Sequence, residues 1–339
     1  MRFLTVTLER DLDMMGSIYY RFAKPIELPP YSFLCMLPNY FGDEIASSVA
    51  KHDIVLVKNL YSMEAANKLI DACHKHNKPI FYDIDDDYLN LPDGNSESSK
   101  MTDETRVIMD FMLKNVTGII VATEPLMGAY KEWNKNIHIL KNYNDISEWK
   151  YGPTKKRSDG RVCIGFAGSS AHQAEFSEYL NAAYKLWEKY GDKIVFRFDG
   201  CSPTGIDTIL PKGVYEVYPD IKPFNEYQSD LPSWGYDIGV APLAHNTFND
   251  CKSHIKWMEY ASYSIPMVGQ SFGPFKRECK HEVDSLLVDS VDEWVTALSE
   301  LIDDTSKRTS IGETANRSII DNWQWKDHVM DWKKIIDRQ

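Results

Sequence analysis

The residues that could do chemistry are concentrated in one stretch, 237–269, which carries two lysines and a glutamate. Lys252 and Ser253 are followed by Lys256 and Glu259, three residues apart. Residues three apart share one face of a helix, so Lys256 and Glu259 would lie side by side. An ammonium group beside a helix N-terminus suits a phosphate, because free backbone N–H groups and the helix dipole point the same way. A carboxylate one turn deeper can accept from two hydroxyls, so this face suits a nucleotide diphosphate with its ribose.

The segments around these charges predict how they are held. Residues 237–243 form a short apolar run that contains a proline near its end, as a buried parallel strand does. A loop rich in asparagine and aspartate follows, and Ser253 stands where the N-cap of the next helix is expected. Residues 265–269 are typical of the next strand. A strand, a polar loop and a helix N-terminus together predict an anion-binding site.

This stretch resembles the donor-binding segment of retaining glycosyltransferases with the GT-B fold, of the large family-4-like group. There a strand D-[IV]-G-[LV]-A-P-L precedes F-N-x-x-K-S-x-x-K-x-x-E-Y-A-x-x-x-I-P-V-V. The matching positions are Phe248, Asn249, Lys252, Ser253, Lys256, Glu259, Tyr260, Ala261, Ile265 and Pro266. The resemblance implies that Asn249, Lys252, Ser253, Lys256 and Glu259 bind the donor, and that Lys256 and Glu259 are also catalytic. Many members carry a further glutamate where this chain has Cys251, which we interpret as a subfamily feature.

A second turn that could contact phosphate is predicted at the start of the second half. Residues 161–167 form an apolar strand that ends at Gly168 and Ser169, ahead of a long amphipathic helix. Glycines in such a turn let the backbone approach a phosphate at a helix N-terminus. The family pattern I-G-[FW]-A-G-S-x-x-H matches here and implies that Gly168 and Ser169 contact the diphosphate. We interpret His172 as a structural histidine that holds this loop.

Candidates for the acceptor side follow the first strand. The segment 16–25 fits the family pattern G-S-x-Y-Y-R-x-x-x-P, which belongs to a loop lining the cleft between the domains. The resemblance implies acceptor-side roles for Gly16, Ser17 and Arg21, with a catalytic role for Arg21. Its guanidinium could neutralise a diphosphate or orient an acceptor hydroxyl. The alternative is an exposed arginine on an N-terminal helix.

An acidic string, YDIDDDY at 82–88, supplies two further candidates. Asp85 and Asp87 could accept hydrogen bonds from acceptor hydroxyls or act as a base, and the alternative is a solvated loop at a strand end. Asp-x-Asp is also the metal-binding signature of glycosyltransferases with the GT-A fold. We decline that interpretation, because GT-A domains lack the downstream lysine–serine and glutamate segment. We therefore predict neither a metal nor a cofactor, with the nucleotide-diphosphate sugar as co-substrate.

Strands and helices alternate along the chain, which predicts doubly wound parallel sheets whose ligands bind beyond the carboxyl ends of strands. The expected strands are 3–8, 32–37, 53–58, 79–84, 118–122, 137–140, 161–167, 193–198, 214–218, 237–243, 265–269 and 285–288. The expected helices include 43–51, 62–76, 103–115, 124–133, 224–231, 292–303, 306–322 and 326–337. With the resemblance, this predicts an α/β chain of GT-B architecture, in which two Rossmann-like domains face a cleft. A polar, basic linker at 149–160 divides an acceptor domain (1–150) from a donor domain (151–322), and a C-terminal helix (323–339) crosses back to the first domain.

Composition excludes several classes of protein. The 339 residues are 43% hydrophobic, enough for two cores. A net charge of −12 gives no general attraction to nucleic acid or anionic lipid. The six cysteines show no paired spacing, so a reducing cytoplasm is expected, and no apolar run is long enough to predict a transmembrane helix.

Together these features predict a metal-independent glycosyltransferase that moves a sugar from a nucleotide-diphosphate donor to an acceptor. The resemblance implies retention at the anomeric carbon. A saccharide of a surface glycan is the common acceptor in the family; a hydroxymethylated DNA base, as in viral enzymes, is a second possibility, for which the basic stretch 131–161 could supply a patch. A protein that binds a sugar nucleotide without turnover, with Cys251 marking lost chemistry, is the alternative from another class.

Overall fold

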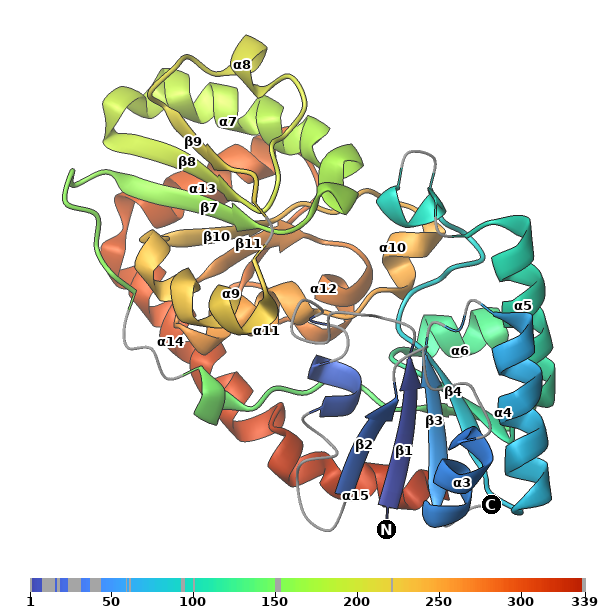
Figure 1. Ribbon diagram of the computed structural model, residues 1–339. Coiled ribbons are helices and arrows are strands. Elements are labelled where there is room, and N and C mark those ends of the chain that lie inside the picture. Colours follow the sequence, from blue (N-terminus) through green and yellow to red (C-terminus); the bar gives the residue numbers. More distant parts are fainter. Residues whose placement is uncertain are drawn as a thin grey trace.

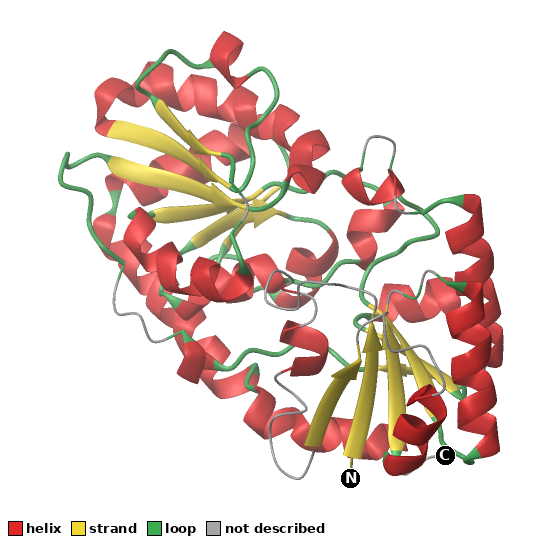
Figure 2. Cartoon of the chain, viewed as in Figure 1, coloured by secondary structure: helices red, strands yellow, loops and turns green. Residues whose placement is uncertain are grey.

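The computed structural model describes residues 2–7, 16, 19–23, 32–36, 44–58, 60, 62–92, 95–99, 101–149, 154–220 and 222–336. These residues form two α/β domains side by side, each built on a parallel sheet with helices on both faces (Figures 1 and 2). The arrowheads of both sheets are directed toward the region where the domains meet (Figure 1). The predicted alternation of strands and helices is confirmed.

The first sheet has the strand order β2-β1-β3-β4-β5-β6, and all its pairs are parallel. Its strands are β1 (Arg2–Thr7), β2 (Ser32–Met36), β3 (Ile54–Lys58), β4 (Ile80–Ile84), β5 (Gly118–Val121) and β6 (Ile137–Ile139). Its helices are α3 (Glu44–Lys51), α4 (Met63–Lys75), α5 (Asp103–Asn115) and α6 (Glu124–Tyr130). The last three begin after Ser62, Thr102 and Thr123, whose hydroxyls accept a first-turn N–H and so end the preceding loop at a defined residue.

The second sheet has the order β12-β11-β10-β7-β8-β9 and is also parallel. Its strands are β7 (Val162–Ala167), β8 (Ile194–Asp199), β9 (Tyr215–Tyr218), β10 (Ile238–Ala241), β11 (Met267–Gln270) and β12 (Leu286–Val288). The helices are α7 (Phe176–Tyr190), α8 (Ile206–Ile209), α9 (Phe224–Asp230), α10 (Thr247–Cys251), α11 (Ile255–Ser262), α12 (Gly273–Glu278), α13 (Val291–Asp303) and α14 (Thr305–Asn322).

Each sheet separates two layers of core, because successive side chains of a strand point to opposite faces. On β1, Leu4 and Val6 pack under α4 and α5, whereas Phe3 faces the other side. On β7, Ile164 and Phe166 pack under α7 and α13, and the opposite face of the second sheet packs against α11 and α14. Burial on both faces explains why these strands are almost uniformly apolar in sequence.

The last helix, α15 (Trp325–Ile336), lies against the first sheet although the chain has by then passed through the second domain (Figure 1). Trp332 meets Phe3 edge to face with ring centroids 5.6 Å apart. Just before the helix, Gln324 pairs with Asn144 in an isolated parallel bridge. The end of the chain therefore packs on the first domain.

Polar contacts join the domains beside the cleft. Asn144 donates to the Ser262 hydroxyl at 2.6 Å, and Lys141 pairs with Glu278 at 2.7 Å. The Thr123 hydroxyl donates to the carbonyl of Cys251 at 2.8 Å, and the Cys251 side chain belongs to the apolar core of the first domain. Cys73, Cys163, Cys201, Cys251 and Cys279 are free and buried. None of the helices described is long and apolar enough to cross a bilayer.

Candidate functional site

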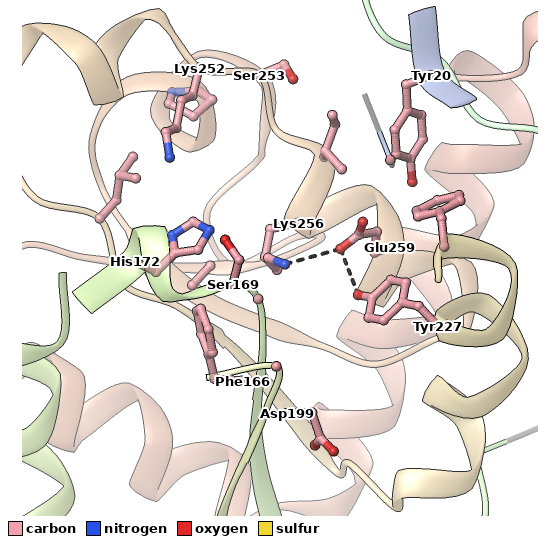
Figure 3. A pocket seen from close by; sticks show the side chains of 18 of the residues that line it. Tyr20, Phe166, Ser169, His172, Asp199, Tyr227, Lys252, Ser253, Lys256 and Glu259 are labelled. Atoms are coloured by element: carbon pink, nitrogen blue, oxygen red, sulfur yellow. Dashed lines mark hydrogen bonds and ion pairs between the residues drawn. The ribbon is translucent and has the colours of Figure 1, made fainter. Parts of the chain in front are cut away.

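A cavity of about 400 Å³ lies between the domains and is lined from both sides (Figure 3). Its walls come from the loops after β4, β7 and β10, which is where ligands of parallel sheets are expected. The volume is in the range of small-molecule sites. The predicted residues that line it are Gly16, Asp85, Gly168, Ser169, Lys252, Ser253, Lys256 and Glu259. Arg21, Asp87 and Asn249 stand behind the lining, and Ser17 falls outside the described residues.

Lys256 and Glu259 lie on one face of α11, as their spacing predicts. Lys256 Nζ is 3.3 Å from Glu259 Oε2, and it also donates to the carbonyl of Ala167. The Tyr227 hydroxyl donates to the same Oε2 at 2.8 Å (Figure 3). Burial, and then the charge of Glu259, raises the pKa of Tyr227 well above its ordinary value, so Tyr227 remains a donor. Both contacts use Oε2, which lets Oε1 accept from hydroxyls of a ligand.

Lys252 reaches the cavity from the residue after α10. Its Nζ is 3.9 Å from Glu175 Oε1, and the other oxygen of Glu175 is 2.5 Å from His172 Nδ1. Burial by itself would raise the pKa of Glu175, but His172 and Lys252 outweigh it and the pKa is lowered. Burial lowers the pKa of His172, although Glu175 acts in the opposite direction. The ionised carboxylate of Glu175 therefore fixes the loop after β7. Its contact with Lys252 is long, so the Lys252 ammonium can also bind an anion in the cavity.

The backbone after β7 passes close to that after β8. Gly200 adopts φ of 84°, and a Cβ there would come within 2.7 Å of the Gly168 carbonyl oxygen. A Cβ on Gly168 would lie 2.8 Å from the Phe166 ring. The predicted long helix begins instead as a 3-10 turn, Ser170–Glu175, and continues as α7. The Ser169 side chain does not cap this turn, so its hydroxyl is available to a ligand.

The predicted N-cap at Ser253 is wrong by one residue. Helix α11 begins at Ile255 with His254 at the N-cap, and the Ser253 hydroxyl accepts instead from Asn142 of the first domain at 2.7 Å. The preceding polar loop contains α10, which begins because the Asn246 side chain accepts from the N–H of Asn249. Asn249 itself is buried and donates to the Ala244 carbonyl at 2.9 Å, so it holds this loop.

Arg21 lies within a short π-helical turn, Tyr19–Ala23, and its side chain is 0% exposed. The alternative of an exposed arginine is therefore wrong. The guanidinium donates to Asp83 through Nε at 3.1 Å and Nη2 at 2.5 Å. Nη1 donates to the Leu140 carbonyl and, at 3.2 Å, to Asn142 Oδ1. The charge of Arg21 is thus compensated inside the first domain.

Asp85 and Asp87 are held differently, although both follow β4. Asp85 lines the cavity and pairs with Lys58 at 2.5 Å. Burial alone would raise the pKa of Asp85, but the Lys58 ammonium outweighs it and the pKa is lowered. Asp87 is fully buried, accepts from the Leu89 N–H and the Asn90 amide, and so closes a turn. The alternative of a solvated loop is wrong for Asp87, because its carboxylate is buried and hydrogen-bonded inside the fold.

Cys251 occupies the position of the further glutamate of the resembling family. It is buried, and its thiol lies 3.8 Å from Asp87 Oδ2. Burial, and then the nearby Asp87, raises the pKa of the thiol to about 12, so Cys251 is the donor of this contact. The residue therefore binds the second domain to the first.

Sequence reasoning missed several residues of the lining. Tyr20 and Asn142 come from the first domain, and Tyr227 and Asp199 from the second. Asp199 ends β8 and is held by Arg197, with contacts of 2.8 and 2.9 Å, and by the Tyr236 hydroxyl at 2.6 Å. Its one sequence signal is a carboxylate followed by glycine at a strand end. Tyr20 belongs to the pattern at 16–25, but that pattern assigned it no role. Asn142 and Tyr227 were not singled out, because they meet the other lining residues only in the folded chain.

No family model matches the chain, and no curated protein matches it. Among solved structures, Anabaena HepE in complex with UDP and glucose superposes with a TM-score of 0.66 over 100% of both chains at 12% identity. Sucrose-phosphate synthase from Thermosynechococcus elongatus has a TM-score of 0.66 at 9% identity, covering 100% of this chain and 99% of that chain. The pneumococcal O-GlcNAc transferase GtfA, in complex with UDP and GlcNAc, has a TM-score of 0.56 at 12% identity, over 86% of this chain and 58% of that chain. The chain therefore has the GT-B architecture, with two Rossmann-like domains facing a cleft.

Proposed function

We propose that the protein is a glycosyltransferase that moves a sugar from a nucleotide-diphosphate donor to an acceptor hydroxyl. The observation that carries the proposal is the pair of Lys256 and Glu259 on α11, side by side on the wall of the cavity between the domains. Solved structures with the same architecture include HepE with UDP-glucose, which supports a nucleotide sugar as the donor class.

In the proposed reaction, the second domain binds the donor. Lys256, Lys252 and the free N–H groups at the start of α11 stabilise the charge that grows on the leaving diphosphate, together with the backbone at Gly168 and Ser169. Glu259 accepts hydrogen bonds from the ribose. The bond between the anomeric carbon and the phosphate oxygen breaks, the acceptor oxygen bonds to that carbon, and the acceptor proton passes to the leaving phosphate. These donors are preorganised and require no metal ion, and we propose retention at the anomeric carbon.

The acceptor is proposed to bind against the first domain, and a saccharide suits this wall better than DNA. Two carboxylates, Asp85 and Asp86, line the cavity there, next to Gly16 and Asn142. Carboxylates accept from sugar hydroxyls but repel backbone phosphates. The net charge of −12 acts in the same direction. Arg21 is proposed to act through Asp83 and Asn142, which it orients, rather than by touching the substrate.

The proposal is tested with labelled donors. A thermal-shift screen across UDP-, GDP-, ADP- and CMP-sugars identifies the donor, because a ligand of the folded state raises its melting temperature. Transfer or hydrolysis of the labelled sugar is then expected to be lost in Lys256→Ala and Glu259→Ala. Lys68→Ala and Glu64→Ala, which break a pair of 2.7 Å on the surface of α4, are the matched controls. Tight binding with no turnover on any acceptor would instead identify a sugar-nucleotide-binding module.

A further inference from the structure

Tyr20 presents a buried polar atom that the donor and acceptor roles above do not use. Its side chain is 0% exposed, it lines the cavity, and its hydroxyl has no hydrogen-bond partner among the described residues. Buried hydroxyls are nearly always paired in folded proteins, because leaving one unpaired costs its hydration. An unpaired hydroxyl on the wall of a ligand-sized cavity therefore indicates a partner that arrives with the ligand.

Two aromatic rings pack against the Tyr20 ring and hold it in place. Tyr19 packs against it edge to face at 5.0 Å, and Phe224 of the second domain does so at 5.5 Å. Figure 3 shows the hydroxyl pointing from the first-domain wall toward Glu259 and Tyr227 on the opposite wall. Burial, and then the charge of Glu259, raises the pKa of Tyr20 well above its ordinary value, so the hydroxyl keeps its proton.

We propose that Tyr20 Oη donates a hydrogen bond to a ribose hydroxyl of the nucleotide that Glu259 holds. This inference rests on the proposed function and adds a donor-recognition residue from the first domain. A ribose hydroxyl that donates to a carboxylate still has lone pairs that need a donor. Glu259 offers only acceptors, and Tyr227 already donates to Glu259. Tyr20 supplies the missing donor, so residues of both domains bind the nucleotide at the same time.

The first test compares Tyr20→Phe with Tyr179→Phe. Tyr179 is equally buried and its hydroxyl also has no partner among the described residues, but it belongs to α7 and packs into the core of the second domain, away from the cavity. Each substitution removes one unpaired buried hydroxyl, so neither is expected to lower the melting temperature of the ligand-free protein. Calorimetric titration with UDP, or with GDP or ADP if one of these gives the larger thermal shift, is expected to show about five- to tenfold weaker binding for Tyr20→Phe only.

The second test removes the ligand's side of the contact. The 2′-deoxy and 3′-deoxy forms of the same nucleoside diphosphate are titrated into wild type and Tyr20→Phe. For the hydroxyl that Tyr20 contacts, the deoxy form is expected to bind wild type more weakly and to erase the difference between the two proteins. A difference that persists at full size with both deoxy forms would overturn the assignment to the ribose.

Failure of this inference is separable from failure of the proposed function. If Glu259→Ala loses nucleotide binding while Tyr20→Phe binds as wild type does, the proposed function stands and Tyr20 has no part in donor recognition. If wild type binds none of UDP, GDP and ADP, both are overturned.

Discussion

The two walls of the cavity use charged residues in opposite ways. On the second-domain wall, Lys252 and Lys256 have side chains that are 18% exposed, with carboxylate contacts of 3.9 and 3.3 Å. Behind the first-domain wall, Arg21 and Lys58 are at most 1% exposed and both pair with the buried Asp83, with an Arg21–Asp83 contact of 2.5 Å. The residue types are similar on the two sides, but their access to solvent and the length of their contacts differ.

This difference separates charged residues that can bind a ligand from charged residues that support the fold. A buried cation whose donors are already used leaves nothing for a ligand, and removing its anion is costly because the charge remains in a medium of low polarity. A cation at the edge of a cavity, with long contacts to its carboxylate, can exchange part of that contact for a phosphate. The sequence motif of the second domain therefore lies at the cavity surface, whereas Arg21 lies behind it.

Arg21 is nevertheless connected, through Asn142, to the second-domain wall of the cavity. Asn142 accepts from Arg21 at 3.2 Å and donates to Ser253 at 2.7 Å. Ser253 lies just before α11, the helix that carries Lys256 and Glu259. The first domain thus fixes the start of the helix that is proposed to bind the donor.

The strongest test of the comparison is Asp83→Ala. It leaves Arg21 and Lys58 buried without their shared anion, and the free energy of unfolding is expected to fall by about 3–5 kcal/mol. Asp53→Ala, which breaks an exposed pair with Arg2, is expected to cost about 1 kcal/mol or less. Urea unfolding at neutral pH measures both. Equal losses in the two variants would show that the first-domain charges are not a buried support.

Lys256→Met is expected to show the reverse pattern. Loss of a charged donor should weaken binding of a nucleoside diphosphate by about 1.5–3 kcal/mol, roughly ten- to a hundredfold, because the phosphate loses a charged partner. Stability should change by less than about 1 kcal/mol, since the side chain is partly solvated. Lys185→Met, which removes an exposed lysine paired with Asp292 in the same domain, is the control for both measurements. A stability loss as large as that of Asp83→Ala would contradict the comparison.

Asn142→Ala tests the connection between the walls. It removes the amide oxygen that accepts from Arg21 and the amide N–H that donates to Ser253. The free energy of unfolding is expected to fall by about 1–2 kcal/mol. Because α11 then begins without its support, nucleotide affinity should fall as well, although by less than in Lys256→Met. Asn115→Ala removes a single exposed side-chain bond to the Phe111 carbonyl and should leave the affinity unchanged. Unaltered nucleotide binding in Asn142→Ala would show that the two walls act independently.

The smallest expected effect concerns His254, which is buried beside the two walls and packs on Trp323 at 4.2 Å. Burial, and then Lys141 and Arg277, lowers its pKa to about 3. The ordinary pKa of a histidine is about 6.5. When the pH falls below that value, His254 takes up a proton in the unfolded chain but not in the folded chain, so the free energy of unfolding falls. From pH 7 to pH 6 this amounts to about 0.7 kcal/mol, and the slope approaches about 1.4 kcal/mol per pH unit lower down.

His254→Phe measures this contribution, because the variant lacks the group that takes up the proton. Urea unfolding at pH 8, 7, 6 and 5 should give curves for wild type and variant that run parallel above pH 7. Below pH 6.5 the wild type should lose more stability than the variant. Parallel curves over the whole range would mean that His254 titrates alike in both states.

The order of strands and helices could be predicted from the sequence, and the structure shifts most predicted ends by a residue or two. Helix α5 has the predicted bounds, and β3 begins one residue later than predicted. Apolar periodicity and side-chain caps act over a few residues, so they are visible in a linear pattern. The spacing of Lys256 and Glu259 was informative for the same reason, since a helix places residues three apart on one face.

The positions that the sequence misassigned are those whose partners lie far along the chain. Ser253 has the right type for an N-cap, but Asn142, 111 residues earlier, holds its hydroxyl. Arg21 is buried because Asp83, 62 residues away, and the carbonyl of Leu140 surround it. Local pattern thus determined the elements, the parallel sheets and the face that carries Lys256 and Glu259. Only tertiary packing decided which charges reach the cavity, because the cost of burying a charge depends on the partners that folding brings to it.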